Sequence, residues 1–276
     1  MLGAIIGDIA GSRFEFNNWK SKDFILFAKN CFVTDDSIMT LAAAMAIMNA
    51  AKNTGTAPYG NYPDTFYERL EQSAVRYMQG MGQLYPHSGY GGMFRKWLKS
   101  DNPKPYNSFG NGAAMRISPA GFAAKNEKEA RRLSKTITAI THNHPEGIKG
   151  AEATVMAIFL AKQGQSINEI REYISKHYYP LDFTIDEIRP TYQFNETCQE
   201  TVPQAIEAFL ESNSFEDALK TGISLGGDSD TIGAITGAIA QAYYGIPDDI
   251  REQALAFLDD DMKSVLAEWE EFINTK

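Results

Sequence analysis

Cysteine is scarce in this sequence, and its scarcity excludes two structural classes. The chain of 276 residues has two cysteines, Cys31 and Cys198, and no Cys-x-x-Cys pair. Such a chain has no disulfide framework, and it lacks the ligand spacing of a zinc ribbon. Unpaired thiols are typical of a reducing compartment, so we expect a cytoplasmic protein.

Basic residues are also in deficit. Lys and Arg number 26 against 35 Asp and Glu, which gives a net charge of −9 at pH 7. An acidic protein repels a phosphate backbone, so general binding of nucleic acid or of an anionic membrane is disfavoured. A small anionic ligand is still compatible with this charge, because backbone amides and one or two basic side chains can hold it.

Long apolar runs are missing as well. No segment reaches the roughly 18 uninterrupted apolar residues that indicate a membrane-spanning helix. The apolar N-terminus, MLGAIIGDIAGSRF, has no basic leading region and is interrupted by Asp8, so we do not expect a signal peptide. A membrane is therefore not an expected partner.

Helical periodicity runs along most of the chain. We predict helices at 1–12, 37–52, 63–80, 127–140, 146–163, 166–177, 199–212, 214–223, 229–244 and 248–275, the last broken near 259–261. Gly, Pro and Asn indicate loops at 86–92, 101–114, 141–147 and about 178–198. Strand patterns are weak, the best being FILFA at 24–28, and no strand–helix alternation indicates a doubly wound sheet. Because no flexible linker interrupts it, the sequence predicts one compact all-α domain over residues 1–276.

Two of the most apolar predicted helices begin with paired aspartates. The motif TDDS carries Asp35 and Asp36, and the motif GGDSDT carries Asp228 and Asp230. Aspartate is a favoured N-cap, and an acidic first turn suits the helix dipole, so each motif alone indicates an ordinary helix start. A cap, however, needs one side-chain oxygen, whereas each motif offers two carboxylates and a threonine.

Glycines follow the second acidic pair at a spacing of four residues. Gly233 and Gly237 leave one helix face free of side chains, which allows close backbone approach and indicates a helix deep in the domain. If both acidic helix ends meet at a cavity, four carboxylates share one site and cannot all stay ionised without cations. Oxygen ligands without His or Cys favour Mg²⁺, Mn²⁺ or Ca²⁺ over Zn²⁺.

Five motifs in this order resemble the ADP-ribosylglycohydrolase family, which includes the dinitrogenase-reductase-activating glycohydrolases. They are GDIAGSRFE (7–15), TDDS (34–37), FGNGAAMRISP (109–119), THNHPEGIKGAEA (141–153) and GDSDTIGAITGAIAQAYYG (227–245). Each motif is weak alone, but together they cover the chain from about residue 1 to residue 250. The resemblance implies an all-helical enzyme with a dimetal cleft that hydrolyses the glycosidic bond at C1″ of an ADP-ribosyl group.

The resemblance also implies two Mg²⁺ or Mn²⁺ ions and their ligands. The family's T-D-D and D-x-D-T motifs match Thr34, Asp35, Asp36, Asp228, Asp230 and Thr231. The family's early glutamate matches Glu15, as a proton-transferring group or as a metal ligand. With Asp35, Asp36 and Asp230, Glu15 completes the expected catalytic set. Ser229 replaces the threonine of many members, which should matter little between two ligands.

Substrate contacts are implied at two further motifs. The loop GNGAAMR matches the family segment that holds the ADP-ribose diphosphate. The resemblance therefore implies that the substrate contacts Gly110, Asn111, Gly112 and Ala113. Glycines let backbone amides approach phosphate oxygens. Without the resemblance, the same loop indicates a simple turn into a helix, in which Asn111 is the cap.

The family also places a histidine of the TH segment beside the ribose and phosphate, which favours His142 over His144. The alternative is that either histidine caps or packs locally. Tyr192 and Phe194 are candidate adenine contacts, with a place in the core as the alternative.

Other functional classes fit less well. HD-type phosphohydrolases need His followed by Asp, a pair that the sequence does not contain. Some lens crystallins resemble the family, so the chain could also be a non-catalytic or differently specific relative that binds ADP-ribose or a related nucleotide. Such a relative should have lost metal ligands, and this chain keeps them. We therefore expect an enzyme acting on an ADP-ribosylated protein or small molecule.

The sequence leaves open the acceptor, the choice of Mg²⁺ or Mn²⁺, and the oligomeric state, for which we expect a monomer. Segments 55–62 and 83–106 are expected to flank the cleft and select the acceptor.

Overall fold

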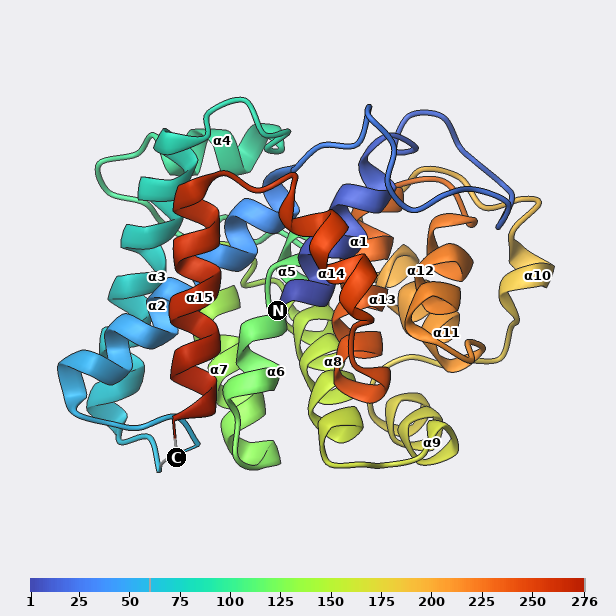
Figure 1. Ribbon diagram of the computed structural model, residues 1–276. Coiled ribbons are helices and arrows are strands. Elements are labelled where there is room, and N and C mark those ends of the chain that lie inside the picture. The colour runs from blue at the N-terminus through green and yellow to red at the C-terminus, as the bar shows by residue number, and fades with distance from the viewer. Residues whose placement is uncertain (60, 276) are drawn as a thin grey trace.

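Helices make up the fold of residues 1–59 and 61–275, the part of the chain that the computed structural model describes (Figure 1). In chain order they are α1 (Leu2–Ser12), α2 (Asp35–Thr54), α3 (Asp64–Leu84), α4 (Gly92–Leu98), α5 (Gly112–Met115), α6 (Ser118–Ala123), α7 (Glu127–Thr138), α8 (Pro145–Lys162), α9 (Ile167–His177), α10 (Ile185–Ile188), a 3₁₀ helix (Cys198–Glu200), α11 (Val202–Leu210), α12 (Phe215–Ile223), α13 (Ser229–Tyr244), α14 (Asp248–Leu255) and α15 (Asp260–Asn274). The prediction of an all-α fold is confirmed. None of the helices in this part of the chain is both long and apolar enough to cross a membrane.

The centre of the fold is the pair α1 and α13, which lie side by side although they come from opposite ends of the chain (Figure 1). A Cβ atom on Gly233 would lie only 2.5 Å from the carbonyl oxygen of Gly7, so this contact requires glycine. All of α1 is buried, and α13 is buried from Ser229 to Ala240. The deep position that the glycine spacing predicts for α13 is therefore confirmed.

The remaining helices pack around this pair and share one apolar core. On one side, α2 packs against α3, and α15 lies against α2 (Figure 1). On the other side, α8, α11 and α12 pack against α13. As a result, the N-terminus of α2 lies close to the N-terminus of α13.

The weak strand signals of the sequence agree with the structure, whereas its short helices were missed. Residues 24–28 form no strand, and in the described chain the one β pairing is an isolated bridge between Gly110 and Thr197. Four short helices, α4, α5, α6 and α10, were not predicted, because four to seven residues show too little periodicity. The predicted break near residue 259 is present, since the Asp259 side chain accepts from Met262 N and starts α15.

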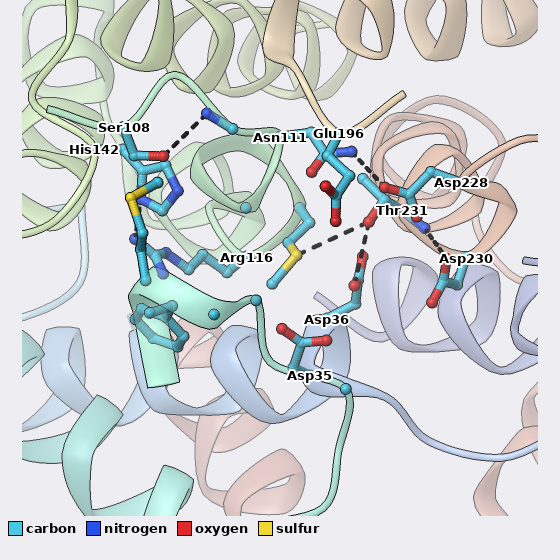
Figure 2. A pocket seen from close by; sticks show the side chains of 18 of the residues that line it. Asp35, Asp36, Ser108, Asn111, Arg116, His142, Glu196, Asp228, Asp230 and Thr231 are labelled. Carbon is cyan, nitrogen blue, oxygen red and sulfur yellow. Dashed lines mark hydrogen bonds between the residues drawn. The ribbon is translucent and has the colours of Figure 1, made fainter. Parts of the chain in front are cut away.

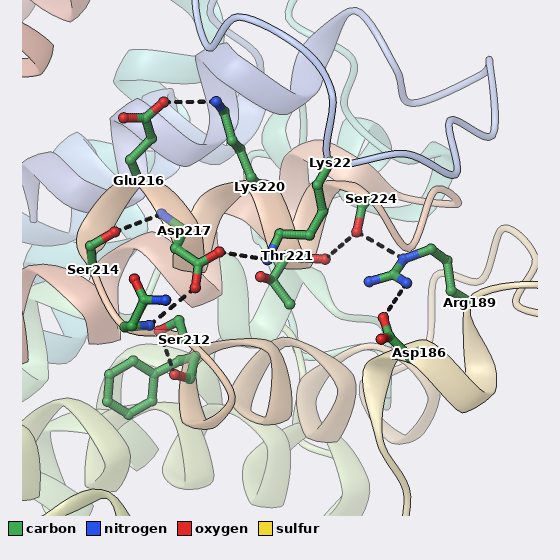
Figure 3. A network of polar contacts seen from close by, with 12 residues as sticks. Lys22, Asp186, Arg189, Ser212, Ser214, Glu216, Asp217, Lys220, Thr221 and Ser224 are labelled. Atoms are coloured by element: carbon green, nitrogen blue, oxygen red, sulfur yellow. Dashed lines mark hydrogen bonds and ion pairs between the residues drawn. The ribbon is translucent and has the colours of Figure 1, made fainter.

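Two long loops, residues 13–34 and 178–197, are both tied to α12 (Figure 3). In the first loop, Lys22 forms an ion pair of 2.5 Å with Asp217 in the first turn of α12. In the second loop, Nε of Arg189 donates to the hydroxyl of Ser224, at 3.0 Å, at the other end of α12. One helix thus anchors the two loops that carry Glu15 and Glu196.

Candidate active site

One cavity collects most of the residues that the motifs single out. Its volume is about 390 Å³, and it lies where the N-termini of α2 and α13 meet (Figure 2). Ten of the predicted site residues line it: Glu15, Asp35, Asp36, Gly110, Asn111, Gly112, His142, Asp228, Asp230 and Thr231. Figure 2 shows the aspartates on one side of the cavity and His142 with Arg116 on the other. The two acidic helix starts, far apart in sequence, therefore share one site.

The start of α2 is held in place by Asp8, a buried residue of α1. Its carboxylate accepts hydrogen bonds from the backbone N–H (3.1 Å) and the hydroxyl (2.7 Å) of Thr34. It also accepts from the backbone N–H of Ser37 (3.1 Å) and from the Ser37 hydroxyl. Burial raises the pKa of Asp8 to about 6, while these four bonds oppose the rise. Asp8 of the GDIAG motif thus orients Asp35 and Asp36. In the sequence it is noticeable only as a break in an apolar run.

The first acidic pair points into the cavity from α2. Oδ2 of Asp36 accepts a weak hydrogen bond from Thr231 Oγ1 (3.3 Å). Oγ1 of Thr34, whose hydrogen goes to Asp8, lies 3.4 Å from the same Asp36 oxygen, so the threonines of both motifs face one carboxylate. Its other oxygen, Oδ1, is buried and has no hydrogen-bond partner within the described chain. The pKa values of Asp35 and Asp36 are raised well above the usual range, first by burial and then by the charge of Asp230.

Three more carboxylates gather at the start of α13. One oxygen each from Glu15, Asp228 and Asp230 lie within 4.8 Å of one another. Burial, followed by the charges of Asp230, Asp8 and Glu196, raises the pKa of Glu15 to about 8. Burial raises the pKa of Asp228 to about 6. Burial and the neighbouring Asp228 charge raise the pKa of Asp230 well above its usual range.

This donor set fits divalent cations. In the described part of the chain, none of the six carboxylates that line the cavity forms an ion pair with Lys or Arg. Buried carboxylates at such distances stay ionised only when cations compensate them. The unpartnered Oδ1 of Asp36 offers a free ligand atom, and donors that are all oxygen suit Mg²⁺ or Mn²⁺. Thr34 does not line the cavity, and its hydroxyl donates its hydrogen to Asp8.

The glycine-rich segment forms another wall of the cavity. Gly110 N–H donates to the Ser108 hydroxyl (3.1 Å), and Asn111 N–H donates to the backbone oxygen of Glu196 (2.7 Å). The Asn111 side chain does not cap α5, so the capping alternative is wrong. Its amide donates instead to Asp228, 2.6 Å away. Ala113 is buried and does not line the cavity.

The two histidines of the TH segment have different places. His142 lines the cavity, and a Cβ on Gly112 would lie 3.3 Å from its Nε2. His144 is the N-cap of α8, where its ring nitrogen Nδ1 accepts from Glu146 N at 3.1 Å. His142, which the family resemblance favours, is therefore the histidine that faces the cavity. His144 has the alternative role, the local capping of a helix.

The predicted aromatic contacts lie away from the cavity lining. Tyr192 is buried, and its hydroxyl donates to the backbone oxygen of Glu200 at 2.5 Å, so it occupies the core position that was the alternative to an adenine contact. Phe194 is 43% exposed and stacks on the exposed Phe16, with ring centroids 6.0 Å apart.

Several lining residues lie outside the predicted set: Met93, Phe94, Tyr106, Ser108, Arg116 and Glu196. Arg116 belongs to the quoted glycine-rich motif, which was the signal available for it. Segment 83–106 contributes to the lining as expected, whereas no described residue of 55–62 does, Gly60 lying outside the described residues. Segment 55–62 follows the C-terminus of α2, whose 20 residues span about 30 Å. Gly55, the C-cap of α2, therefore lies at the end of this helix opposite the cavity.

Known proteins with similar sequences match most of this chain. ADP-ribosylhydrolase ARH3 from Homo sapiens is 26% identical, over 89% of this chain and 84% of that protein. ADP-ribosyl-[dinitrogen reductase] glycohydrolase from Rhodospirillum rubrum is 28% identical, over 82% of this chain and 74% of that protein. A solved structure, titled ADP-ribosylglycohydrolase-related protein complex, has the same fold, with a TM-score of 0.61 at 20% identity over 99% of this chain and 95% of that one. The sequence pattern of the ADP-ribosylglycohydrolase family matches residues 1–274, and the chain belongs to this family.

Proposed function

We propose that this chain hydrolyses the glycosidic bond at C1″ of ADP-ribosyl groups and releases ADP-ribose from a modified protein or small molecule. The observation that carries the proposal is the meeting of two acidic helix starts and Glu15 in one cavity with a glycine-rich wall. Family membership supports it, as do relatives such as ADP-ribosylarginine hydrolase Tri1 from Pseudomonas putida (strain GB-1), 24% identical over 89% of this chain and 70% of that protein.

The acidic side of the cavity would hold Mg²⁺ or Mn²⁺. Asp35, Asp36, Asp228 and Asp230 are the ligands we assign, with the hydroxyls of Thr34 and Thr231 beside them. When bound, two such ions supply Lewis-acid polarisation and orient a water and the ribose hydroxyls. Asp8 holds Asp35 and Asp36 at the N-terminus of α2 through its hydrogen bonds to Thr34.

The carboxylates themselves contribute to the bond cleavage. Positive charge develops at C1″ as the glycosidic bond breaks, and a preorganised set of negative oxygens stabilises it. Glu15 reaches this cluster from the turn after α1, where burial raises its pKa and bound cations would lower it again. A carboxyl group in this position can give a proton to the leaving group or take one from water.

The opposite wall would hold the diphosphate of the ligand. Gly110 and Gly112 carry no side chain that would cover their backbone, and His142 lies beside both. The amides of Gly110 and Asn111 are already bonded to Ser108 and Glu196, so the amide of Gly112 and the ring N–H of His142 are the donors we assign to phosphate oxygens. Met93 and Tyr106 line the remaining part of the cavity, so we place the acceptor group near segment 83–106.

The decisive experiment measures release of ADP-ribose from defined acceptors modified on arginine, on serine, on a nucleic-acid base, and from O-acetyl-ADP-ribose. Each is tested with Mg²⁺, with Mn²⁺ and with EDTA, and the Asp230→Ala variant serves as the control for contaminating activity. We expect metal-dependent release from at least one acceptor. Binding of ADP-ribose without any release would favour the non-catalytic alternative, and absence of both would overturn the proposal.

We further propose a cytoplasmic location, supported by two buried cysteines that form no disulfide. A monomeric state stays a prediction, and sedimentation of the purified chain would decide it.

A further inference from the structure

Arg116 is a buried cation at the end of α5, and it lines the cavity on the same side as His142. Its side chain is 1% exposed, and no carboxylate lies within ion-pair distance in the described part of the chain. The guanidinium carbon lies 5.2 Å from the ring centroid of Phe94. Its Nη2 atom is 2.5 Å from Oγ1 of Thr141 and 3.1 Å from Nδ1 of His142 (Figure 2).

These contacts decide which nitrogen of His142 carries the proton. A guanidinium group has donors only, so this contact is a hydrogen bond only when Nδ1 of His142 accepts, and a protonated Nδ1 would face the cation. The hydroxyl of Thr141, 2.8 Å from Nδ1, can accept from Arg116 and donate to the same ring nitrogen. With Nδ1 unprotonated, the ring is neutral and its single proton lies on Nε2.

The protonated nitrogen faces the ligand wall. Cβ atoms on Gly112 and Gly110 would lie 3.3 Å and 3.7 Å from Nε2 of His142. A ring protonated on Nδ1 would turn a lone pair toward an incoming anion, which repels it. Burial, followed by the charge of Arg116, lowers the pKa of His142 well below its usual value, so the ring stays a neutral donor.

We propose that Arg116 is a positioning residue that fixes His142 as the Nε2–H tautomer, so that this N–H donates to a phosphate oxygen of the ligand held by the glycine-rich wall. The identity of that ligand as an ADP-ribosyl group rests on the proposed function. The buried guanidinium has the further effect of a positive charge that the anionic ligand compensates when it binds. Arg116 acts through His142, so its replacement should alter the ring before it alters the chemistry.

The first experiment observes the tautomer by NMR of the ligand-free protein labelled with ¹⁵N-histidine. The chain has four histidines, and the signals of His142 are those missing from His142→Ala. We expect a protonated Nε2 and an unprotonated Nδ1 that persist from pH 8 to pH 5.5. In Arg116→Met the ring should populate both tautomers, and its pKa should rise toward the usual value of about 6.5 without reaching it, because burial still lowers it. A ring protonated on Nδ1 in the unaltered protein would overturn the proposal, even if Arg116→Met does not fold.

Two further variants separate Arg116 from its neighbour. Arg116→Lys keeps the charge and a donor, and it should preserve the Nε2–H tautomer. Thr141→Val removes the hydroxyl but leaves the guanidinium, and it should preserve the tautomer too. Loss of the tautomer in Thr141→Val, together with its retention in Arg116→Met, would assign the role to Thr141 and contradict the proposal.

The second experiment measures ADP-ribose affinity by calorimetry in a double-mutant cycle. Arg116→Met should weaken binding by roughly 10- to 100-fold, the scale of one hydrogen bond to a charged group. In the His142→Ala background the same change should cost little more, because the donor it orients is already gone. Fully additive losses would show that Arg116 acts independently of His142. Absence of ADP-ribose binding in the unaltered protein, with the expected tautomer, would overturn the proposed ligand and not the tautomer.

Discussion

The side-chain amide of Asn111 donates a hydrogen bond of 2.6 Å to Oδ2 of Asp228. Both residues are buried, and the bond joins the glycine-rich wall to the start of α13. Hydrogen bonds to a buried carboxylate are strong, and this one favours the ionised form of Asp228. The phosphate side and the metal side of the cavity are therefore coupled through one amide.

This coupling predicts the effect of Asn111→Ala on metal binding. Without the amide, ionised Asp228 loses a donor, so we expect Mn²⁺ affinity at pH 7 to fall by roughly 10-fold or more, the scale of one charge-assisted hydrogen bond. Calorimetric Mn²⁺ titration measures it. Thr201→Val is the matched control, because it removes the other partner of the Asn111 amide and keeps the bond to Asp228. Equal affinities for Asn111→Ala and the unaltered chain would refute the coupling.

The cluster of buried carboxylates predicts how stability depends on pH when cations are removed. Glu15 has an ordinary pKa of 4.5 when the chain is unfolded and about 8 in the folded, metal-free protein. Between these values the folded state binds more protons, so stability is fully present below about pH 4.5 and is lost as pH rises toward 8. The raised pKa values of Asp8 and Asp228 act in the same direction up to about pH 6.

We therefore expect the melting temperature in EDTA to fall between pH 5.5 and pH 8. Saturating Mg²⁺ or Mn²⁺ should raise it most at pH 8, because metal binding competes with protons for the same oxygens. Thermal melts over this pH range, with and without metal, measure both effects. Coincident curves at pH 8 would mean that the site does not hold cations.

Asp8 should be a major determinant of both stability and metal affinity. Asp8→Asn leaves one acceptor oxygen where four donors from Thr34 and Ser37 converge, and it turns an amide N–H toward them. In saturating Mg²⁺ we expect a loss of about 1–3 kcal/mol in the free energy of unfolding, the cost of buried unsatisfied donors. Urea denaturation measures the loss. Ser37→Ala, which removes one hydroxyl, should cost less, and an unchanged Asp8→Asn protein would show that α2 needs no such clamp.

Gly112→Val tests the phosphate wall. Even the first carbon of the new side chain would lie 3.3 Å from Nε2 of His142, and the branches beyond it would cover the approach to the wall. ADP-ribose affinity should fall by at least 10-fold, about the scale of one lost charge-assisted hydrogen bond, while Mn²⁺ affinity stays unchanged. Parallel calorimetry with the two ligands measures the contrast. Retained ADP-ribose binding would place the diphosphate elsewhere in the cavity.

The sequence predicts the parts of this site that are carried by local motifs. Paired aspartates at two helix starts can be found in the sequence, and the glycines of α13 indicate that its start is buried. Long-range contacts cannot be found in this way. Nothing local to Asp8 shows that it will accept four bonds from residues 34 and 37, and nothing local to Arg116 shows that it faces Nδ1 of His142.

Glu15 is the residue whose role is most open to a direct test. Glu15→Gln keeps the size and one acceptor oxygen of the side chain but cannot transfer a proton at neutral pH. If the carboxyl group transfers the proton, single-turnover release of ADP-ribose should slow by roughly 10²–10⁴-fold, the scale of general acid–base catalysis, with metal affinity nearly unchanged. Asp230→Ala, which removes an assigned ligand, should abolish turnover instead and lower Mn²⁺ affinity.

Measuring release across a metal titration separates the two roles of Glu15. Its oxygens lie within 4.8 Å of those of Asp228 and Asp230, close enough to share a cation with them. If Glu15 is mainly a ligand, excess Mn²⁺ should restore part of the rate of Glu15→Gln, because mass action refills a weakened site. If it transfers a proton, the rate should stay low at every metal concentration, since no amount of metal replaces the missing carboxyl group. Near-normal release at all concentrations would exclude both roles of Glu15.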